Sequence, residues 1–183
     1  MALLKITTYG NPVLRKKVSP VKKVDATLKK LAGNMLETMR HADGIGLAAP
    51  QIGKSISLFV VDTSPIEEGS QPMIFLNIEI LENHGSAPYN EGCLSIPGVM
   101  GEVMRPDRIK IRYMDLSGKI HEGMADGILA RVIQHETDHL NGKLFIDYLS
   151  EETLEPFQPI LKELELQNKK LLAKRKTAKA AAR

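Results

Sequence analysis

Hydrophobic residues recur at helical spacing in three parts of the chain. The first part begins at Asp25, a residue type that often caps a helix, and ends near Met39. The second covers residues 128–140 and is followed by Gly142 as a stop signal, and the third runs from about Ile160 to Lys176. We therefore expect three helices, the first a core-facing helix with no chemistry of its own.

Other segments have the composition and alternation of β-strands. Residues 56–62 and 73–81 are rich in β-formers and are separated by a polar loop at 64–72. Residues 103–124 are typical of a hairpin, because 109–113 alternates and a turn follows at 115–118. Residues 1–20 are predicted to form an irregular, partly extended arm. Strands and helices together predict an α+β fold.

The second predicted helix carries two histidines four residues apart, His135 and His139, with Glu136 between them. Residues at this spacing lie one turn apart on the same helix face, so both imidazoles can bind one metal ion. Glu136 projects beside them and can handle a water on the metal. The His-Glu-x-x-His pattern thus supplies two ligands and a general base. A buried structural histidine pair is the alternative, and we favour the metal site.

The lone cysteine, Cys93, is a candidate for the third ligand. A single cysteine excludes an internal disulfide and fits a reducing compartment. Cys93 lies in the short segment 91–98, which is bounded by Gly and Pro and is consistent with an edge or loop position. Such a cysteine by itself is most often a small buried hydrophobe. The two-histidine site lacks a third ligand, and this favours Cys93 as a thiolate ligand.

The glycine-rich stretch 44–53 imitates a dinucleotide-binding fingerprint in its first six residues. The context is wrong, because a helix precedes it and Pro50 would interrupt the helix that should receive the phosphates. We therefore expect no nucleotide cofactor. The glycines instead predict a close-packed loop that lets a substrate backbone approach and presents the amide of Gln51.

Charge is distributed unevenly along the 183 residues. The net charge is +3, but residues 167–183 hold seven Lys/Arg and no acid, which leaves 18 basic and 22 acidic side chains elsewhere. We expect a catalytic domain at 1–157 and a basic C-terminal helix or tail at 158–183. No run of 18 apolar residues and no secretory pattern is present, so we expect a cytoplasmic protein with neither membrane nor DNA as partner.

Three segments together resemble the signature motifs of the peptide deformylase family: GIGLAAPQIG at 44–53, EGCLSIPG at 91–98 and QHETDHLNG at 134–142. The resemblance covers roughly residues 1–150. It implies a small single α+β domain, with antiparallel or mixed sheets packed around a central metal-binding helix. It also implies hydrolysis of the N-formyl group from the initiating methionine of nascent chains, with release of formate.

The resemblance further implies one divalent ion held by Cys93, His135 and His139. Iron(II) would be the physiological ion, with zinc, nickel or cobalt in preparations. Glu136 would carry the proton, while the Gln51 side-chain amide and the Leu94 backbone N–H would stabilise the oxyanion.

Because formyl is small, specificity must come from an apolar pocket for the methionine side chain. Arg131 could shield the mouth of this pocket through its alkyl stem. The candidates for its wall are Ile45, Gly46, Ile128, Val132 and His135. N-formylmethionyl nascent peptides are the expected substrates, and the basic tail suggests contact with the ribosome.

Two other interpretations remain open. A zincin-type metallopeptidase would use Glu155 or Glu163 as its third ligand, but Glu155 abuts Pro156 and Glu163 lies in the charged tail. That interpretation leaves Cys93 unexplained. A ribosome- or RNA-binding protein would use the metal only structurally, and the basic tail supports it. Release of formate would exclude the first interpretation, and a fourth protein ligand would favour the second.

Overall fold

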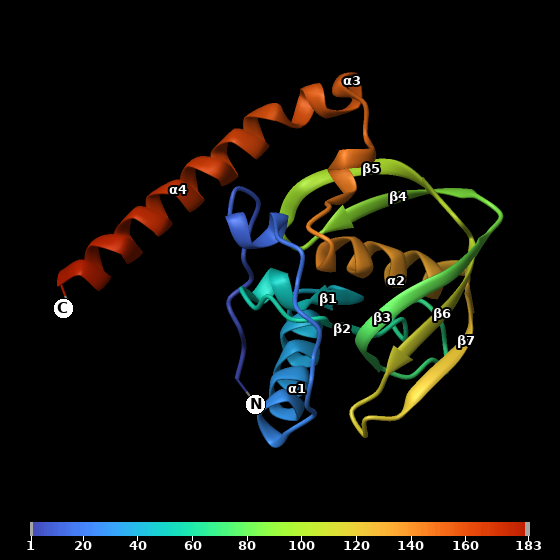
Figure 1. Ribbon diagram of the computed structural model, residues 1–183. Coiled ribbons are helices and arrows are strands. Elements are labelled where there is room, and N and C mark those ends of the chain that lie inside the picture. The colour runs from blue at the N-terminus through green and yellow to red at the C-terminus, as the bar shows by residue number, and fades with distance from the viewer. Residues whose placement is uncertain (1, 182–183) are drawn as a thin grey trace.

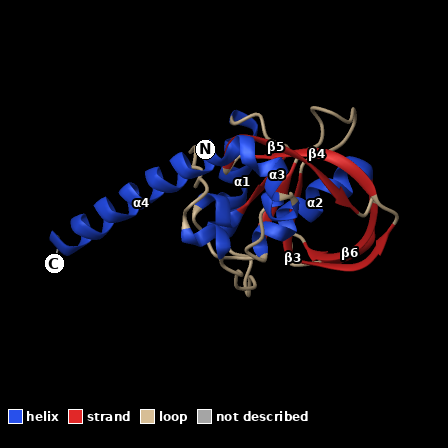
Figure 2. Ribbon diagram, turned by 90° about the horizontal axis from the view of Figure 1, so that it is seen from above, coloured by secondary structure: helices blue, strands red, loops and turns tan. Residues whose placement is uncertain are grey.

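Helix α2 (Gly127–Leu140) is the element around which the protein is built. The computed structural model describes residues 2–181, and for 175, 176 and 178–181 only the backbone. Apolar residues of α2, among them Ala130 and Ile133, pack against a five-stranded sheet. On the other side of α2 lies a two-stranded hairpin, as the view from above shows (Figure 2). The predicted α+β fold, with sheets around the central helix, is confirmed.

The larger sheet is antiparallel, with strand order β1-β2-β3-β6-β7 (Figure 1). Its strands are β1 (Gly46–Ala48), β2 (Leu58–Val61), β3 (Met73–His84), β6 (Arg108–Met114) and β7 (Ile120–Asp126). The strands predicted at 56–62 and 73–81 are therefore confirmed, as is the turn at 115–118. The predicted hairpin at 103–124 begins too early, because residues 103–105 belong to another strand.

That strand is β5 (Ile96–Arg105), which pairs only with β4 (Ala87–Cys93). Sequence patterning missed this hairpin because glycines and prolines interrupt it and charged residues take inward positions. Glu91 on β4 and Arg105 on β5 are both buried, so the apolar alternation that marks a half-buried strand is broken. The segment gains its order from tertiary contacts rather than from its own pattern.

Helix α1 (Ala26–His41) begins where the sequence predicts, because the Asp25 side chain accepts a hydrogen bond from the Leu28 N–H at 2.8 Å. Its buried Met35 and Met39 pack in a cluster with residues of β1 and β2. The prediction of a loop at 44–53 is only partly correct. Residues 46–48 form the edge strand β1, and Ala49–Ile52 form a 3-10 helix, η2.

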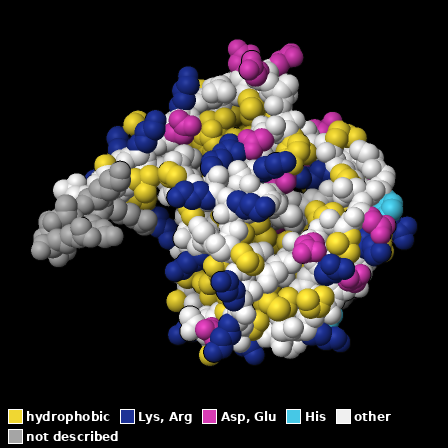
Figure 3. Space-filling view, in the orientation of Figure 1, with side chains coloured by type: hydrophobic (Ala, Val, Ile, Leu, Met, Phe, Trp, Pro, Cys, Tyr) yellow, Lys and Arg dark blue, Asp and Glu magenta, His cyan; other side chains and the backbone are white. Residues whose placement is uncertain are grey.

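Helix α4 (Gln158–Ala181) projects from the body (Figure 1). Its first part is anchored by the buried Leu161, Leu164 and Asn168. It is preceded by α3 (Glu151–Leu154), whose acidic residues lie at the top of Figure 3, and by η4 (Glu155–Phe157). Two further 3-10 helices are η1 (Pro12–Arg15) and η3 (Phe145–Tyr148). Within the described residues, no helix has an apolar stretch long enough to cross a membrane.

Candidate active site

The end of β4 and one face of α2 bring three metal-binding side chains together. The donor atoms of Cys93, His135 and His139 all lie within 4.8 Å of one another. Cys93 Sγ is 3.3 Å from His139 Nε2, and the two imidazole rings are 5.1 Å apart between centroids. Glu155 and Glu163, the alternative third ligands, are not part of this group.

These three residues fit a single divalent ion. A tetrahedral ion with bonds of about 2.0–2.3 Å holds its donor atoms roughly 3.5 Å apart, close to the observed spacing. A thiolate with two imidazoles suits zinc and other late first-row metals. His139 is buried and its Nδ1 has no hydrogen-bond partner. Burial and the nearby His135 lower the pKa of His139, which favours the neutral imidazole that a metal requires.

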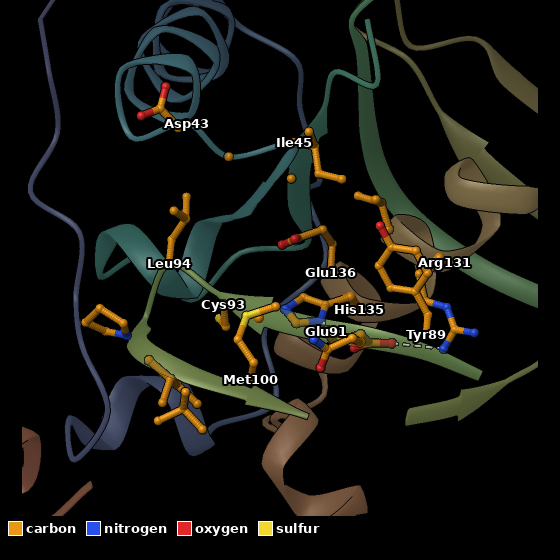
Figure 4. A pocket seen from close by; sticks show the side chains of 18 of the residues that line it. Asp43, Ile45, Tyr89, Glu91, Cys93, Leu94, Met100, Arg131, His135 and Glu136 are labelled. Atoms are coloured by element: carbon orange, nitrogen blue, oxygen red, sulfur yellow. Dashed lines mark hydrogen bonds and ion pairs between the residues drawn. The ribbon is translucent and has the colours of Figure 1, made fainter. Parts of the chain in front are cut away.

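Glu136 is buried and lines a cavity beside these three ligands (Figure 4). Burial raises the pKa of its carboxyl group to about 7. Its Oε2 atom has no hydrogen-bond partner, while Oε1 lies against Gly46 so closely that a Cβ there would clash. A carboxyl group with a pKa near neutrality can both accept and release a proton, as a general acid–base catalyst must.

Two potential oxyanion donors lie beside the three-ligand cluster. The Gln51 side chain on η2 is buried, and its Oε1 accepts the Ala48 N–H at 2.7 Å. This bond orients the amide, so that Nε2 faces Cys93 Sγ at 3.5 Å. Leu94 follows Cys93 in the two-residue turn that joins β4 to β5. A backbone N–H therefore fixes the Gln51 amide, and the tight turn fixes the Leu94 N–H. Both groups lie next to the candidate ligand Cys93.

Glu91 is a functional residue that sequence reasoning missed. It accepts hydrogen bonds from His135 Nδ1 at 2.9 Å, from Arg105 at 2.7 and 3.1 Å and from Arg131 at 3.0 Å. Burial would raise the pKa of Glu91, but the bonds from His135 and Arg105 lower it to about 2. The carboxylate orients His135, leaving Nε2 free for a metal. The sequence did contain one indication that Glu91 belongs to the site. It lies two residues before Cys93, and side chains two apart in a strand lie on the same face.

Arg131 lines the cavity, but it is not the exposed side chain at the mouth of the pocket that the sequence analysis expected. It is buried, and its guanidinium donates to the carbonyls of Val103 and Ala87 as well as to Glu91 (Figure 4). It therefore ties α2 to the β4–β5 hairpin. Tyr89, whose ring lies over this guanidinium at 5.7 Å, is the exposed residue on that side.

A cavity of about 380 Å³ opens beside the three-ligand cluster. The structure brings nearly every residue predicted for the site to this cavity, including Gln51, Cys93, Leu94, His135 and Glu136. The residues predicted for the wall of the methionine pocket also line it: Ile45, Gly46, Ile128, Val132 and His135. His139 belongs to the ligand cluster, although it does not line the cavity.

Replacing Glu91 with glutamine should destabilise the fold and loosen His135. The change leaves the buried Arg131 without its anionic partner and leaves Arg105 with Asp138 alone, which costs about 3 kcal/mol. For a chain of this size the melting temperature should fall by roughly 6–12 °C. Thermal unfolding measures this, with Glu102→Gln as the control, because Glu102 is an exposed carboxylate on the paired strand. Equal melting temperatures for the two variants would contradict the role of Glu91.

Three converging ligands, a buried carboxyl group that can carry a proton and an adjoining apolar cavity define a metal-dependent hydrolase. Comparison with known proteins gives the family. The model of the polypeptide deformylase family matches residues 3–155, and the chain belongs to this family. The family removes the N-formyl group from nascent polypeptides and is metal-dependent. The predicted family, enzyme class and reaction are confirmed. The alternatives of a zincin-type metallopeptidase and of an RNA-binding protein with a purely structural metal are therefore wrong.

Relatives in sequence and structure agree. The peptide deformylases of Alkalilimnicola ehrlichii and Chlorobium phaeobacteroides are 49% and 50% identical over 152 and 147 residues, covering 82% and 79% of this chain and 84% and 80% of theirs. The crystal structure from Thermotoga maritima has a TM-score of 0.77 at 46% identity, covering 82% of this chain and 99% of that one. The Thermus thermophilus structure has a TM-score of 0.84 at 40% identity, covering 91% and 99%.

Proposed function

We propose that the enzyme hydrolyses the N-formyl group of formylmethionyl nascent peptides at one divalent ion held by Cys93, His135 and His139. The observation that carries this proposal is the convergence of three donor atoms beside one cavity, together with the buried carboxyl group of Glu136, whose Oε2 has no hydrogen-bond partner. When bound, the ion would polarise the formyl carbonyl and lower the pKa of water. We propose iron(II) as the physiological ion, and the same donors accept zinc, nickel or cobalt.

Glu136 would move the proton. Its carboxylate accepts a proton from the attacking water as the hydroxide adds to the formyl carbon, and it then gives the proton to the leaving amine nitrogen. The amide C–N bond breaks, so the products are formate and a free N-terminal amine. The raised pKa of the carboxyl group suits both halves of this transfer at neutral pH.

Gln51 and Leu94 would stabilise the negative charge that develops on the formyl oxygen. The Gln51 Nε2 amide is already oriented by the Ala48 N–H, so it needs no reorganisation during the reaction. The Leu94 backbone N–H lies in a tight turn directly after Cys93. Such preorganised donors act in the transition state more than in the ground state.

The substrate would bind as an extended strand between two sheet edges. β1 is an edge strand of the five-stranded sheet, and β4 pairs only with β5. Both β1 and β4 supply residues to the cavity wall, so a peptide there can use main-chain hydrogen bonds. Ile45, Ile128 and Val132 would contact the methionine side chain, while Gly46 allows close backbone approach. Main-chain recognition suits an enzyme whose substrates share only their first residue.

Formate release from one formyl-Met peptide, measured together with metal content, tests this function. The matched control is the same peptide with an N-acetyl group, which adds one methyl group to the acyl carbon. We expect formate in proportion to bound metal and much slower hydrolysis of the acetyl peptide. Cleavage of an internal peptide bond without formate would overturn the proposal.

We propose that the basic end of α4 contacts ribosomal RNA. Its support is the excess of seven Lys/Arg over residues 167–183, of which Lys169, Lys170 and Lys174 are exposed. Elsewhere, Lys and Arg side chains are spread over the visible face of the body, with acidic side chains between them (Figure 3). The division at residues 157 and 158 and the cytoplasmic location stay predictions.

Removing residues 173–183 should weaken ribosome binding while turnover of a short formyl peptide is unchanged. The truncation deletes five of the seven charges but keeps the docked part of α4. Phosphate contacts release counterions, so the affinity of the full-length enzyme should fall steeply with salt and that of the truncated enzyme less so. Sedimentation with ribosomes at several salt concentrations measures this. Equal binding of both proteins at low salt would contradict the proposal.

A further inference from the structure

The N-terminal arm touches both backbone segments that carry the proposed oxyanion donors. The Thr7 N–H donates to the Gln51 carbonyl at 2.6 Å, and the Tyr9 N–H donates to the Ser95 carbonyl at 2.8 Å. Gln51 lies on η2, whereas Ser95 shares the β4–β5 turn with Leu94. The arm segment Thr7–Tyr9 thus links η2 to the β4–β5 turn, two segments that are far apart in the sequence.

The β4–β5 turn is covered, which is unusual for a hairpin turn. Connecting segments generally lie at the surface, yet Ser95 is fully buried. Tyr9 and Cys93 both pack against the hydrophobic cluster that contains Ile96. The arm around Thr7–Tyr9 forms no regular helix or strand of its own, so its position depends on outside contacts.

Asn168 on α4 supplies such contacts. Its Nδ2 faces the Thr8 Oγ1 and the Tyr9 carbonyl at 2.8 Å each, and the Thr8 carbonyl at 3.2 Å. Asn168 is only 4% exposed, although it lies in a helix that otherwise projects from the body (Figure 1). Next to this contact, Gly10 has a positive φ of 88° and lies so close to Glu165 on α4 that a side chain would clash. The arm and the helix are therefore fitted to each other at this point.

We propose that Asn168 is a positioning residue for the deformylation site. It holds Thr8 and Tyr9, and through the neighbouring N–H groups of Thr7 and Tyr9 it fixes the backbones of Gln51 and of the Leu94–Ser95 turn. The inference rests on the proposed function, in which Gln51 and Leu94 donate to the oxyanion. Donors of this kind work because they are held in place in advance, and small displacements weaken them sharply.

Kinetics of Asn168→Ala in the full-length, metal-loaded enzyme test the proposal. We expect kcat to fall about tenfold with KM nearly unchanged, because oxyanion donors act mainly in the transition state. Gln167→Ala is the matched control: Gln167 is the exposed neighbour, and its side chain bonds only to Glu163. Asn168→Asp keeps the shape but removes the donor, so it should lose kcat as Asn168→Ala does. Normal kcat in Asn168→Asp would overturn the proposal, because packing alone would then suffice.

Hydrogen exchange supplies a second readout that is independent of turnover. In Asn168→Ala the amides of Thr7 and Tyr9 should exchange faster, while those in the core of α1 keep their protection. Thr8→Val is a milder change that removes one acceptor of the Asn168 amide, and it should give a smaller loss of kcat. Faster exchange without any loss of kcat would overturn the proposal, because Asn168 would then only fasten the arm.

Gln51→Ala separates this inference from the proposed function. Its kcat should fall about a hundredfold, and adding Asn168→Ala should then cost less than it does alone, because part of the effect of Asn168 acts through the Gln51 donor. An unchanged kcat in Gln51→Ala would overturn the oxyanion assignment and, with it, the inference. A large loss in Gln51→Ala with an unaltered kcat in Asn168→Ala would overturn the inference alone.

Discussion

Replacement of Glu136 by glutamine should leave the metal bound and lower kcat by about a thousandfold, the range expected for loss of a general acid–base group. Glutamine has the same shape, so Gly46 still fits against it, and no ligand is removed. What disappears is the only buried carboxyl group among the described residues that lines the cavity without an ion-pair partner. The proton then has no carrier between the attacking water and the leaving amine.

Formate release and metal content of the same preparation measure this effect. Asp43→Asn is the matched control, because Asp43 lines the same cavity but is exposed. The control should retain nearly full activity, which would show that loss of a cavity carboxylate alone does not abolish turnover. Near-normal formate release by metal-loaded Glu136→Gln would remove Glu136 from the mechanism.

Replacement of Cys93 by serine should cause the enzyme to lose its metal during dialysis. An alcohol stays protonated at neutral pH and is a much poorer anionic ligand than a thiolate. Loss of an outer partner of a ligand typically costs 10–100-fold in affinity, so loss of a direct ligand should cost more than about a hundredfold. Activity should fall with the metal content.

Metal stoichiometry after dialysis checks this prediction. The control is Leu94→Ala, which alters the next side chain but keeps the three ligands and the Leu94 backbone N–H. Full metal content in Cys93→Ser would mean that Cys93 is a buried hydrophobe and that the ion is held without it.

The structure gives the C-terminal helix two parts with different expected roles. Up to Asn168, α4 is docked on the N-terminal arm and is linked through it to the candidate site. Beyond that point the helix extends away from the body, and this part carries most of the basic residues of the C-terminal segment 158–183 (Figure 1). Truncation experiments should therefore cut after Asn168, because an earlier cut would mix the proposed effect on catalysis with the proposed effect on ribosome binding.

The sequence by itself determined the features that depend on short-range spacing. The Asp25 cap and the apolar positions of α1 predict that helix, and the alternation at 109–113 predicts β6. His135 and His139 were expected on one face of α2 because helical geometry leaves little choice at a spacing of four residues. The three motifs together also identified the family. In each case the information lies within a few neighbouring residues.

Only the tertiary structure decided how separate segments meet. It places Cys93 beside two histidines more than 40 residues away, and it gives Glu91 three cationic or ring N–H partners from β5 and α2. It buries Arg131, which the sequence analysis expected at the mouth of the pocket. Buried charges interrupt the hydrophobic pattern of the β4–β5 hairpin. Their partners lie on other elements, so no local rule can predict which ones pair.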